Sequence, residues 1–530
     1  MKLDKLALLI AILFLGVPMV TAQEKAGEKL GKVDFPVSCS PAAQAQFNRA
    51  VAMLHSFWFP QAPKAFAAVS EMDPDCAMAH WGIAISQRAN PLVGPPDAAA
   101  LKRGLASIEK AKAIGAKTQR ERDYIAAIEL LYRDSDKLDH RTRVLAYEKA
   151  MEKLYLAYSQ DIEAAIFYAL ALNEAIDYHD KTYARQLKAA KILENAYAKQ
   201  PEHPGVLHYL THSYDFPPLA DRGIDTAKRY ASVAPSAPHA LHMPSHIFSM
   251  VGMWQDSIKS NREALGVAKN YVHAMDFMVY AHLQLAQDGE AKRLVEESAA
   301  LYKTQAPTAQ LTPTGGVLGI HTAFAAIPAR YAIERGAWAD AAALQPRPST
   351  PAADAITYFT RAMGAVRQGN ANSARKDIEQ LESLKNTLTT AKQKYWADQV
   401  EIQRRAAAAW LAQAEGKKNE ALKLMRSAAA LEDASEKHVA MENRLWPMRE
   451  LLGEMLLQLN EPAQALKEFE ASFKAAPNRF RGYYGAAKAA ERAGDQKQAR
   501  SHYEKLVELS KQADADRPEL REAKAFLAKK

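Results

Sequence analysis

Histidines recur in the middle of this chain at a fixed interval of thirty-four residues. His208 and His212 lie four residues apart, and His242 and His246 repeat that pair thirty-four residues later. The same interval separates three further pairs: His239 and His273, Pro201 and Pro235, and Pro204 and Pro238. A fixed period of about 20–50 residues is typical of repeat proteins, in which each unit packs mainly against its neighbours. We therefore predict a chain of stacked repeats.

The composition indicates that these repeats are helical. Alanine, leucine, glutamate, lysine and glutamine, which favour helices, are abundant, and alternating runs of β-branched residues are nearly absent. At 530 residues the chain exceeds what a single compact core usually accommodates. The net charge of +8 is spread along the sequence without basic runs, which argues against a nucleic-acid partner. The predicted fold class is all-α.

Residues 1–22 have the parts of a secretory signal peptide. Lys2 and Lys5 give a positive start, residues 6–17 form an apolar stretch too short to span a bilayer comfortably, and small residues precede Gln23. We predict cleavage before Gln23, a periplasmic or secreted protein, and no membrane span in the mature chain. An uncleaved N-terminal anchor is the alternative.

The chain contains two cysteines, Cys39 and Cys76, both near the start of the predicted exported part. In an oxidising compartment such a pair most simply forms a disulfide. Two free thiols, or a thiol that serves as a metal ligand, are the alternatives. We predict the disulfide, because the histidines lie far downstream in the sequence.

Two stretches at opposite ends of the chain match the consensus of a known repeat family. Ala62, Phe66 and Pro74 have its spacing near the N-terminus. Near the C-terminus the consensus places are occupied by Leu452, Gly453, Ala465, Phe469 and Pro477. On these residues the chain resembles the tetratricopeptide repeat (TPR) family, whose thirty-four-residue unit is a helix pair. The resemblance implies a right-handed α-solenoid of helix-turn-helix repeats.

A narrower resemblance rests on the phrases MLHSFWF, DPDCAMAHWGIA and HALHMPSHIF. They are similar to phrases in a group of exported bacterial TPR proteins of about this length, which share a motif HxxHxPSHIF. This resemblance supports the solenoid architecture and says little about chemistry.

Turn-rich stretches divide the chain into six predicted segments. They are a signal peptide (1–22), an extended segment (23–39), an N-terminal TPR-like solenoid with the histidines (40–302), a linker rich in Thr, Pro and Gly (303–316), a C-terminal TPR-like solenoid (317–515), and a C-terminal tail or helix (516–530).

The TPR resemblance also implies which side chains face the concave groove. In this family the second, fifth and ninth positions of each repeat point into it. The residues at these positions are His239 and His273, then His208, His242 and Asp276, then His212, His246 and Tyr280. His55 falls at another groove-facing position and is expected to line the groove, as is Tyr280. Residues four apart on a helix share one face, so the spacing alone also predicts a histidine pocket.

A cluster of neutral imidazoles is the ligand type that zinc and copper prefer, and an i, i+4 pair on one helix face can chelate one ion. We therefore predict a transition-metal site. Its candidate ligands are His208, His212, His239, His242, His246, His273 and Asp276. The expected ion is copper or zinc, with iron as a further candidate, and its affinity should fall below about pH 6 as free imidazoles protonate.

Pro244 complicates the helical spacing of this site. Inside a helix it would remove a hydrogen bond and kink the chain, whereas at the first position of a shorter helix it would be well tolerated. In the second case His239 and His242 lie ahead of the helix that carries His246. Both possibilities stay open at the level of sequence.

The predicted groove allows two kinds of function. A metal site would serve a metal-dependent enzyme acting on a small molecule, or would organise a partner. Alternatively, the groove binds peptides or partner proteins without metal, and its histidines make that binding depend on pH. We find no nucleophile elbow, phosphate loop or dinucleotide fingerprint that would indicate another chemistry.

Overall fold

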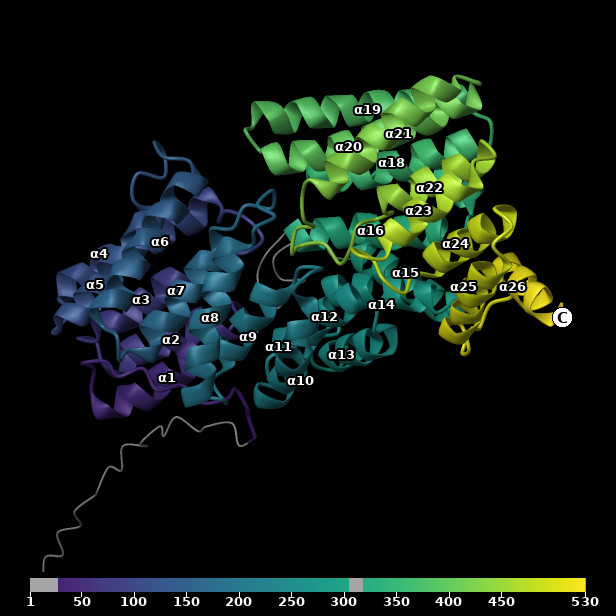
Figure 1. Ribbon diagram of the computed structural model, residues 1–530. Coiled ribbons are helices and arrows are strands. Elements are labelled where there is room, and N and C mark those ends of the chain that lie inside the picture. Colours follow the sequence, from purple (N-terminus) through teal and green to yellow (C-terminus); the bar gives the residue numbers. More distant parts are fainter. Residues whose placement is uncertain (1–26, 305–317, 530) are drawn as a thin grey trace, which may run out of the picture.

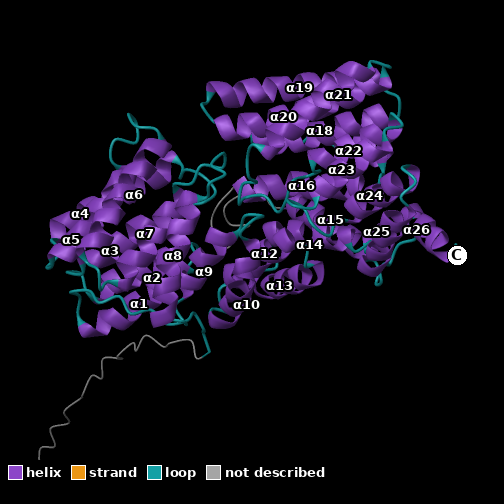
Figure 2. Cartoon of the chain, in the orientation of Figure 1, coloured by secondary structure: helices purple, strands orange, loops and turns teal. Residues whose placement is uncertain are grey.

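The structure, a computed structural model, describes residues 27–304 and 318–529. Throughout these residues the chain forms helices joined by turns and loops, without any strand (Figures 1 and 2). The prediction of an all-α, TPR-like solenoid is confirmed. The predicted signal peptide (1–22) and most of the predicted linker (303–316) lie outside the described residues. None of the described helices is long and apolar enough to span a bilayer.

The helices of the N-terminal part are α1 (Pro41–His55), α2 (Ala62–Met72), α3 (Ala77–Ser86), α4 (Ala98–Ile114), α5 (Gln119–Tyr132), α6 (His140–Ala157), α7 (Ile162–Glu174), α8 (Ala184–Lys199), α9 (Pro204–Tyr214), the 3-10 helix η1 (Ala220–Gly223), α10 (Ile224–Val233), α11 (Pro238–His242), α12 (Pro244–Val251), α13 (Trp254–Val267), α14 (Val272–Gln284) and α15 (Asp288–Thr304). The helices of the C-terminal part are α16 (Leu318–Glu334), α17 (Trp338–Ala342), α18 (Pro351–Arg367), α19 (Ala371–Thr390), α20 (Lys394–Ala414), α21 (Lys418–Asp433), α22 (Met448–Gln458), α23 (Pro462–Ser472), α24 (Phe480–Arg492), α25 (Gln496–Leu509) and α26 (Pro518–Ala528).

The local sequence explains where many of these helices begin. Ser40 and Asp97 each precede a helix and accept a hydrogen bond from a backbone N–H of its first turn. Proline occupies the first turn of three of the four helices that carry the clustered histidines, with Pro204 in α9, Pro238 in α11 and Pro244 in α12. Its fixed φ suits a helix start, where no N–H is needed. Pro204 and Pro238, which share the histidine period, therefore mark the starts of two histidine-bearing helices.

Consecutive helices pack against one another along the chain, as helix-pair repeats require. Buried apolar side chains form one core from α1 to α12 and another that extends through the C-terminal part, with a smaller cluster around α13 to α16. Figure 1 shows the early helices on one side, the late helices on the other and α10 to α16 between them.

Several contacts join the N-terminal and C-terminal parts, and two of them matter for the histidines. Helix α14 packs against α16 and α24. The segment 434–447, which links α21 to α22, reaches back to the N-terminal part, where the Glu436 N–H donates to the Tyr178 carbonyl oxygen at 2.7 Å. The hydroxyl of Tyr183 donates to the carboxylate of Glu436 in the same region. The two parts therefore pack together across the predicted linker.

The N-terminal part contains a disulfide between Cys39 and Cys76, with a Cα–Cα distance of 4.9 Å. The bond joins the start of α1 to the start of α3, so it closes the first helix pair. A cross-link that closes a loop of this length stabilises a fold by about 3–4 kcal/mol on the loop-entropy model. The first repeat thus gains a covalent clamp.

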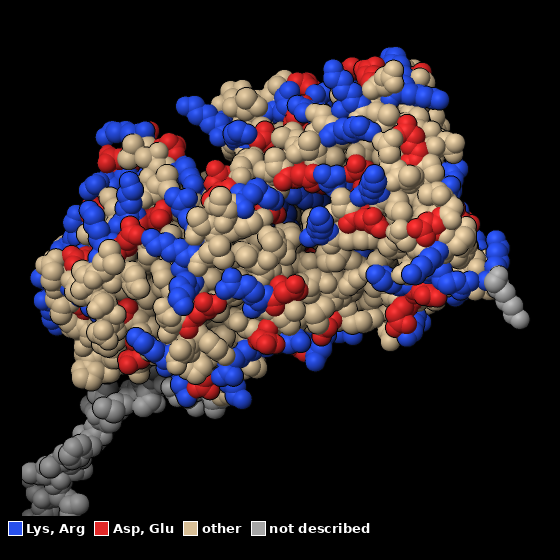
Figure 3. Space-filling view, viewed as in Figure 1, with Lys and Arg blue, Asp and Glu red and all other residues tan. Residues whose placement is uncertain are grey.

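Charged side chains of both signs are interspersed on the face of the molecule drawn in Figure 3. No broad patch of a single sign covers that face. This distribution agrees with the scattered charge of the sequence.

Two glycines of the solenoid are required by close helix packing. A Cβ added to Gly82 of α3 would collide with the ring of Phe66 in α2. A Cβ added to Gly485 of α24 would collide with the ring of Phe469 in α23. We expect Gly82→Ala to destabilise the protein by about 1–3 kcal/mol, as overpacking does. Gly266→Ala is the matched control, because its Cβ would meet nothing within 4 Å, and it should be neutral or stabilising by up to about 1 kcal/mol. Denaturant unfolding of both variants measures the difference, and equal effects would contradict the packing argument.

Candidate metal centre

Six imidazoles converge where α9, α11, α12 and α14 meet the segment 434–447. Helix α9 carries His208 and His212, α11 carries His239 and His242, α12 carries His246, and α14 carries His273. Five of the six side chains are no more than 5 % exposed, and His273 is partly buried. The structure thus brings together the six histidines of the predicted ligand set in the protein interior.

Pro244 does not separate the ligands. Helix α11 ends at His242 and α12 begins at Pro244, and Met243 between them keeps helical dihedral angles (φ −53°, ψ −35°). The chain therefore continues in a helical course through the proline. Nε2 of His242 lies 3.0 Å from Nε2 of His246, so the i, i+4 relation survives.

The first histidine group consists of His208, His212 and His239, whose candidate ligand atoms all lie within 4.8 Å of one another. Nε2 of His208 is 3.1 Å from Nε2 of His212 and 3.1 Å from Nε2 of His239. The Nδ1–H of His208 donates to the carbonyl oxygen of His55 at 2.6 Å. Because that carbonyl can only accept, the neutral His208 ring presents a bare Nε2 to its two neighbours.

The second histidine group consists of His242, His246 and His273, which satisfy the same distance limit. Nδ1 of His246 lies 2.9 Å from Oδ2 of Asp215, and Nδ1 of His242 lies 2.6 Å from Oδ1 of Asn261. The Asn261 side-chain N–H donates to the Ser257 carbonyl oxygen at 2.8 Å, so its Oδ1 is the atom that faces His242. Both Nδ1 atoms therefore carry the proton.

This assignment leaves two nitrogen lone pairs facing each other. In the neutral state neither His242 Nε2 nor His246 Nε2 has a hydrogen to donate, yet the atoms are 3.0 Å apart. Two ligands of a tetrahedral zinc ion, each about 2.0–2.1 Å from it, lie about 3.3 Å apart, and a right angle at the metal brings them to about 2.9 Å. The separation thus fits two nitrogens that share one cation. Outer hydrogen bonds that hold Nδ1–H and aim Nε2 are also typical of metal-bound histidine.

Burial keeps these imidazoles neutral at ordinary pH. Desolvation lowers the pKa of His208 to about 3 and the pKa of His242 to about 4. The pKa also lies well below its ordinary value in four further imidazoles. Desolvation is again the largest cause, and the neighbouring charged groups come second. The four are His212, His239, His246 and His273. Metals bind the neutral form, so the site is prepared for metal without a prior loss of protons. The expectation that protonation near pH 6 weakens binding holds for free imidazoles, not for these rings in the folded protein.

The segment 434–447 and α16 cover the two groups. A cavity of about 20 Å³ adjoins both histidine groups and these covering elements. It is lined by histidines of both groups and by Ile320, Val439 and Ala440. Lys437 of the same segment is 6 % exposed, and its Nζ lies 3.3 Å from Oδ1 of Asp215. The candidate centre is therefore largely buried among the described residues, with His273 its most exposed member, whereas the sequence predicted histidines that line an open groove.

Two residues of the predicted groove do not join the histidines. Asp276 is buried and accepts a hydrogen bond from Nε of Arg330 at 3.0 Å. Tyr280 is also buried, and its hydroxyl accepts from Arg479 while the Arg330 guanidinium lies 4.7 Å from its ring centroid. Both side chains thus belong to the packed contact between α14 and the C-terminal part. The predicted roles of Asp276 as a ligand and Tyr280 as a groove residue are not supported by this geometry.

His55 is buried beside the first group instead of lining a groove. Its Nε2 lies 2.9 Å from Oε2 of Glu163, and His203 Nε2 lies 2.8 Å from the other carboxylate oxygen. His203 Nδ1 accepts from the N–H of Gly205 at the start of α9. Glu163 therefore bridges two imidazoles whose nitrogens have protein partners, and this cluster acts as a support that also holds His208 through the His55 carbonyl.

Sequence reasoning missed the residues that orient the imidazoles. Asp215 and Tyr271, which contact His246 and His239, stand within three residues of His212 and His273, so their proximity was a usable signal. Asn261 belongs to α13, where the repeat period gives no hint of a site. Lys437 lies far along the chain, and nothing in its local sequence connects it to the histidines.

Comparisons with known proteins show structural likeness alone. No protein-family model and no curated protein sequence matches the chain. The human IFIT1 dimer with m7Gppp-AAAA has a TM-score of 0.40 at 11 % identity, over 82 % of this chain and 90 % of that one. A tetratricopeptide repeat protein from Parabacteroides merdae has a TM-score of 0.25 at 12 % identity, over 69 % and 98 % of the two chains. The Naa15/Naa10 complex bound to HypK gives 0.25 and 12 %, over 92 % and 73 %. The TPR-like description of this chain therefore rests on its own helices.

Proposed function

We propose that the two histidine groups bind transition-metal ions and that the solenoid serves to build this centre. The observation that carries the proposal is the contact between His242 Nε2 and His246 Nε2, two unprotonated nitrogens 3.0 Å apart in the protein interior. Without a cation, this contact would be repulsive. Asp215 and Asn261 accept hydrogen bonds from the Nδ1 atoms of these two rings, so each Nε2 points inward. Metal-bound histidines are held by outer hydrogen bonds of the same kind.

The donor set favours copper or zinc, with iron as a further candidate. All six candidate ligand atoms are imidazole nitrogens, which suit these ions, whereas magnesium and calcium prefer oxygen. Three protein ligands also leave a coordination position open, as catalytic zinc sites do. The centre therefore suits metal-dependent chemistry on a small molecule, or a metal that organises the contact between the two parts of the chain.

The alternative of a metal-free peptide-binding groove is less well supported at this place. A peptide would have to displace the segment 434–447 to touch the imidazoles, because the cavity beside them measures about 20 Å³. The segment is tied down by Lys437 and Glu436. We further propose that the protein works after export, since the signal-like residues 1–22 and the Cys39–Cys76 disulfide both suit an oxidising compartment.

The test is elemental analysis of protein purified without an affinity tag, compared with the double variant His208→Gln/His242→Gln. Glutamine keeps most of the buried volume and removes one ligand from each histidine group. We expect wild type to hold transition metal in stoichiometric amount after dialysis, and the variant to lose at least nine tenths of it, because metal sites depend steeply on each ligand.

A matched control removes two histidines that lie outside both groups, His140→Gln/His502→Gln, at α6 and α25. Its metal content should equal that of wild type, and circular dichroism should show that all three proteins are folded. If wild type holds no metal and takes up none from copper, zinc, iron or manganese salts, the proposal is wrong. Peptide binding then becomes the better explanation of the histidines.

A further inference from the structure

The two histidine groups lie side by side with their open sides toward a common space. Ring centroids of His212 and His246 are 5.9 Å apart, and those of His239 and His242 are 5.8 Å apart. Given the proposed metal binding, on which this step rests, we infer that the centre holds two metal ions, one in each group, which share a single small anionic oxygen ligand derived from water or dioxygen.

Two ions fit the geometry better than one. Within each group the candidate nitrogens lie within 4.8 Å of one another, and the six nitrogens separate into two such sets. An ion held by one set reaches its nitrogens at about 2.0–2.1 Å, which leaves it too far from the other set to bind all six. Paired ions in two-metal sites are about 3.5–4 Å apart, and ring centroids about 6 Å apart across the boundary accommodate such a pair.

The space between the groups limits what the ions can share. The cavity of about 20 Å³ is lined by His212 and His239 of the first group and by His246 and His273 of the second. Its remaining wall includes the apolar side chains of Val93, Ile320 and Val439. A volume of this size holds about one water molecule. The shared ligand is therefore limited to an oxygen species of one or two heavy atoms.

The charges around the centre require that ligand to be an anion. The imidazoles are neutral, and Asp215 is the carboxylate that a hydrogen bond places against them among the described residues. The buried ammonium of Lys437 already balances Asp215. Asp276 and Glu442 face Arg330 instead, at 3.0 and 3.6 Å. Glu163 lies one ring further out, against His55 and His203. Two cations at the six imidazoles therefore have no unbalanced carboxylate in direct contact with those rings among the described residues, and buried charge is costly without a partner.

Two sources can supply such an anion. A water molecule becomes hydroxide when it loses one proton, a loss that metal ions promote. Dioxygen becomes bound peroxide when it gains two electrons, and two copper(I) ions supply these as each becomes copper(II). The second route breaks no bond to the protein and needs no proton. Both routes end with one oxygen ligand between two copper(II) ions.

Copper is a suitable probe whatever the native ion is, because the unpaired electrons of two copper(II) ions couple through a shared ligand and their magnetic resonance signal disappears. Apo-protein is loaded with copper(II) under argon in one arm, and with copper(I) followed by dioxygen in the other. Copper is counted by elemental analysis and compared with the electron paramagnetic resonance intensity. We expect two copper ions per chain, with a signal far below one spin for each copper.

The variants His239→Gln and His273→Gln each remove a ligand from a single group. Each should retain one copper per chain with full signal intensity, an outcome that a merely structural role of these histidines would not produce. Coupling in the first arm identifies a water-derived ligand, and coupling that appears only in the second identifies a dioxygen-derived one.

One copper per chain in wild type, or two coppers with full signal in both arms, would overturn the inference while leaving the proposed metal binding intact. Absence of any bound copper, zinc, iron or manganese would instead remove the proposed function itself.

Discussion

We expect the metal-free protein to lose stability steeply as the pH falls below about 6.5, the ordinary pKa of histidine. Burial lowers the pKa of His208 to about 3 and the pKa of His242 to about 4. Between these values and 6.5 the unfolded chain binds protons that the folded chain excludes, so unfolding is favoured. At pH 5 each of these two histidines costs about 2 kcal/mol of stability relative to pH 7.

Denaturant unfolding at pH 7 and pH 5, in the presence of a chelator, measures this effect. The stability of His208→Gln/His242→Gln should fall by about 4 kcal/mol less than that of wild type over this range. The comparison between proteins matters, because burial raises the pKa of Glu442 to about 8, and this acid changes stability in the opposite direction as the pH falls. Equal pH dependence in the two proteins would contradict the lowered pKa values. Added metal should move the loss of stability to lower pH, since it binds the folded state.

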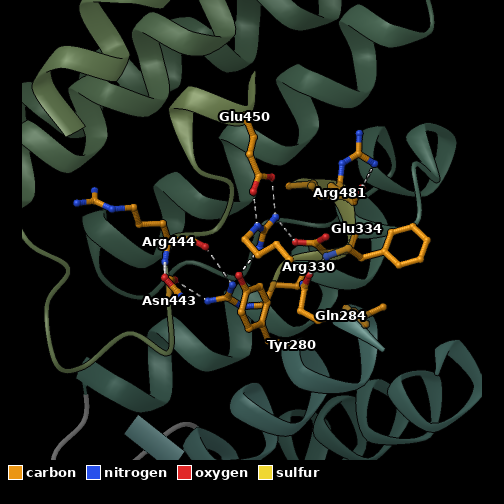
Figure 4. A network of polar contacts seen from close by, with 12 residues as sticks. Tyr280, Gln284, Arg330, Glu334, Asn443, Arg444, Glu450 and Arg481 are labelled. Carbon is orange, nitrogen blue, oxygen red and sulfur yellow. Dashed lines mark hydrogen bonds and ion pairs between the residues drawn. The ribbon is translucent and has the colours of Figure 1, made fainter. Parts of the chain in front are cut away.

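Arg479→Met should destabilise the protein by about 3–5 kcal/mol. The Arg479 guanidinium donates to Glu334 and to Glu450, each at 2.8 Å, and none of the three side chains is more than 1 % exposed. Figure 4 shows this network, in which the carboxylates of Glu334 and Glu450 converge near Tyr280. Methionine fills similar space but leaves two carboxylates buried without their cation, and that loss costs more than the pair itself contributes.

The control for Arg479→Met is Arg521→Met. Arg521 pairs with Asp516 at 2.5 Å, but both side chains are more than half exposed, and exposed pairs contribute about 0–1 kcal/mol. Thermal unfolding of the two variants should therefore separate them clearly. A second comparison, Arg479→Met/Glu334→Gln/Glu450→Gln, should recover part of the lost stability because it removes the unpaired charges. Similar losses for Arg479→Met and Arg521→Met would show that the buried network does not hold α14 to the C-terminal part.

The histidine period predicted the fold because it reports local geometry. A thirty-four-residue interval fixes which helices are equivalent, and neighbouring repeats must then place equivalent residues side by side. For this reason the sequence placed His208, His212, His242 and His246 in one region. Two of the prolines that share the period, Pro204 and Pro238, carried equally local information, since each stands in the first turn of a helix.

The sequence could not predict how this region is closed. Asp276 and Tyr280 occupy equivalent positions to the histidines, but they meet Arg330 and Arg479, which lie far along the chain. Whether a concave surface stays open depends on such long-range contacts, for which a repeat period carries no information. The division of six imidazoles into two groups has the same origin, because it depends on the tilt between helices and on outer partners such as Asn261.

The enclosure by the segment 434–447 bears on how fast metal can enter and leave. Contacts such as Lys437 with Asp215 and Glu436 with Tyr178 hold this segment over the buried imidazoles and so restrict the access of an ion from solution. Exchange then proceeds through local opening, whose free energy can be much smaller than that of global unfolding. The residence time of the ion is set by this opening as well as by the strength of the metal–nitrogen bonds. Such a centre retains its metal against an external chelator for as long as the segment stays closed, even where the chelator binds the ion more tightly.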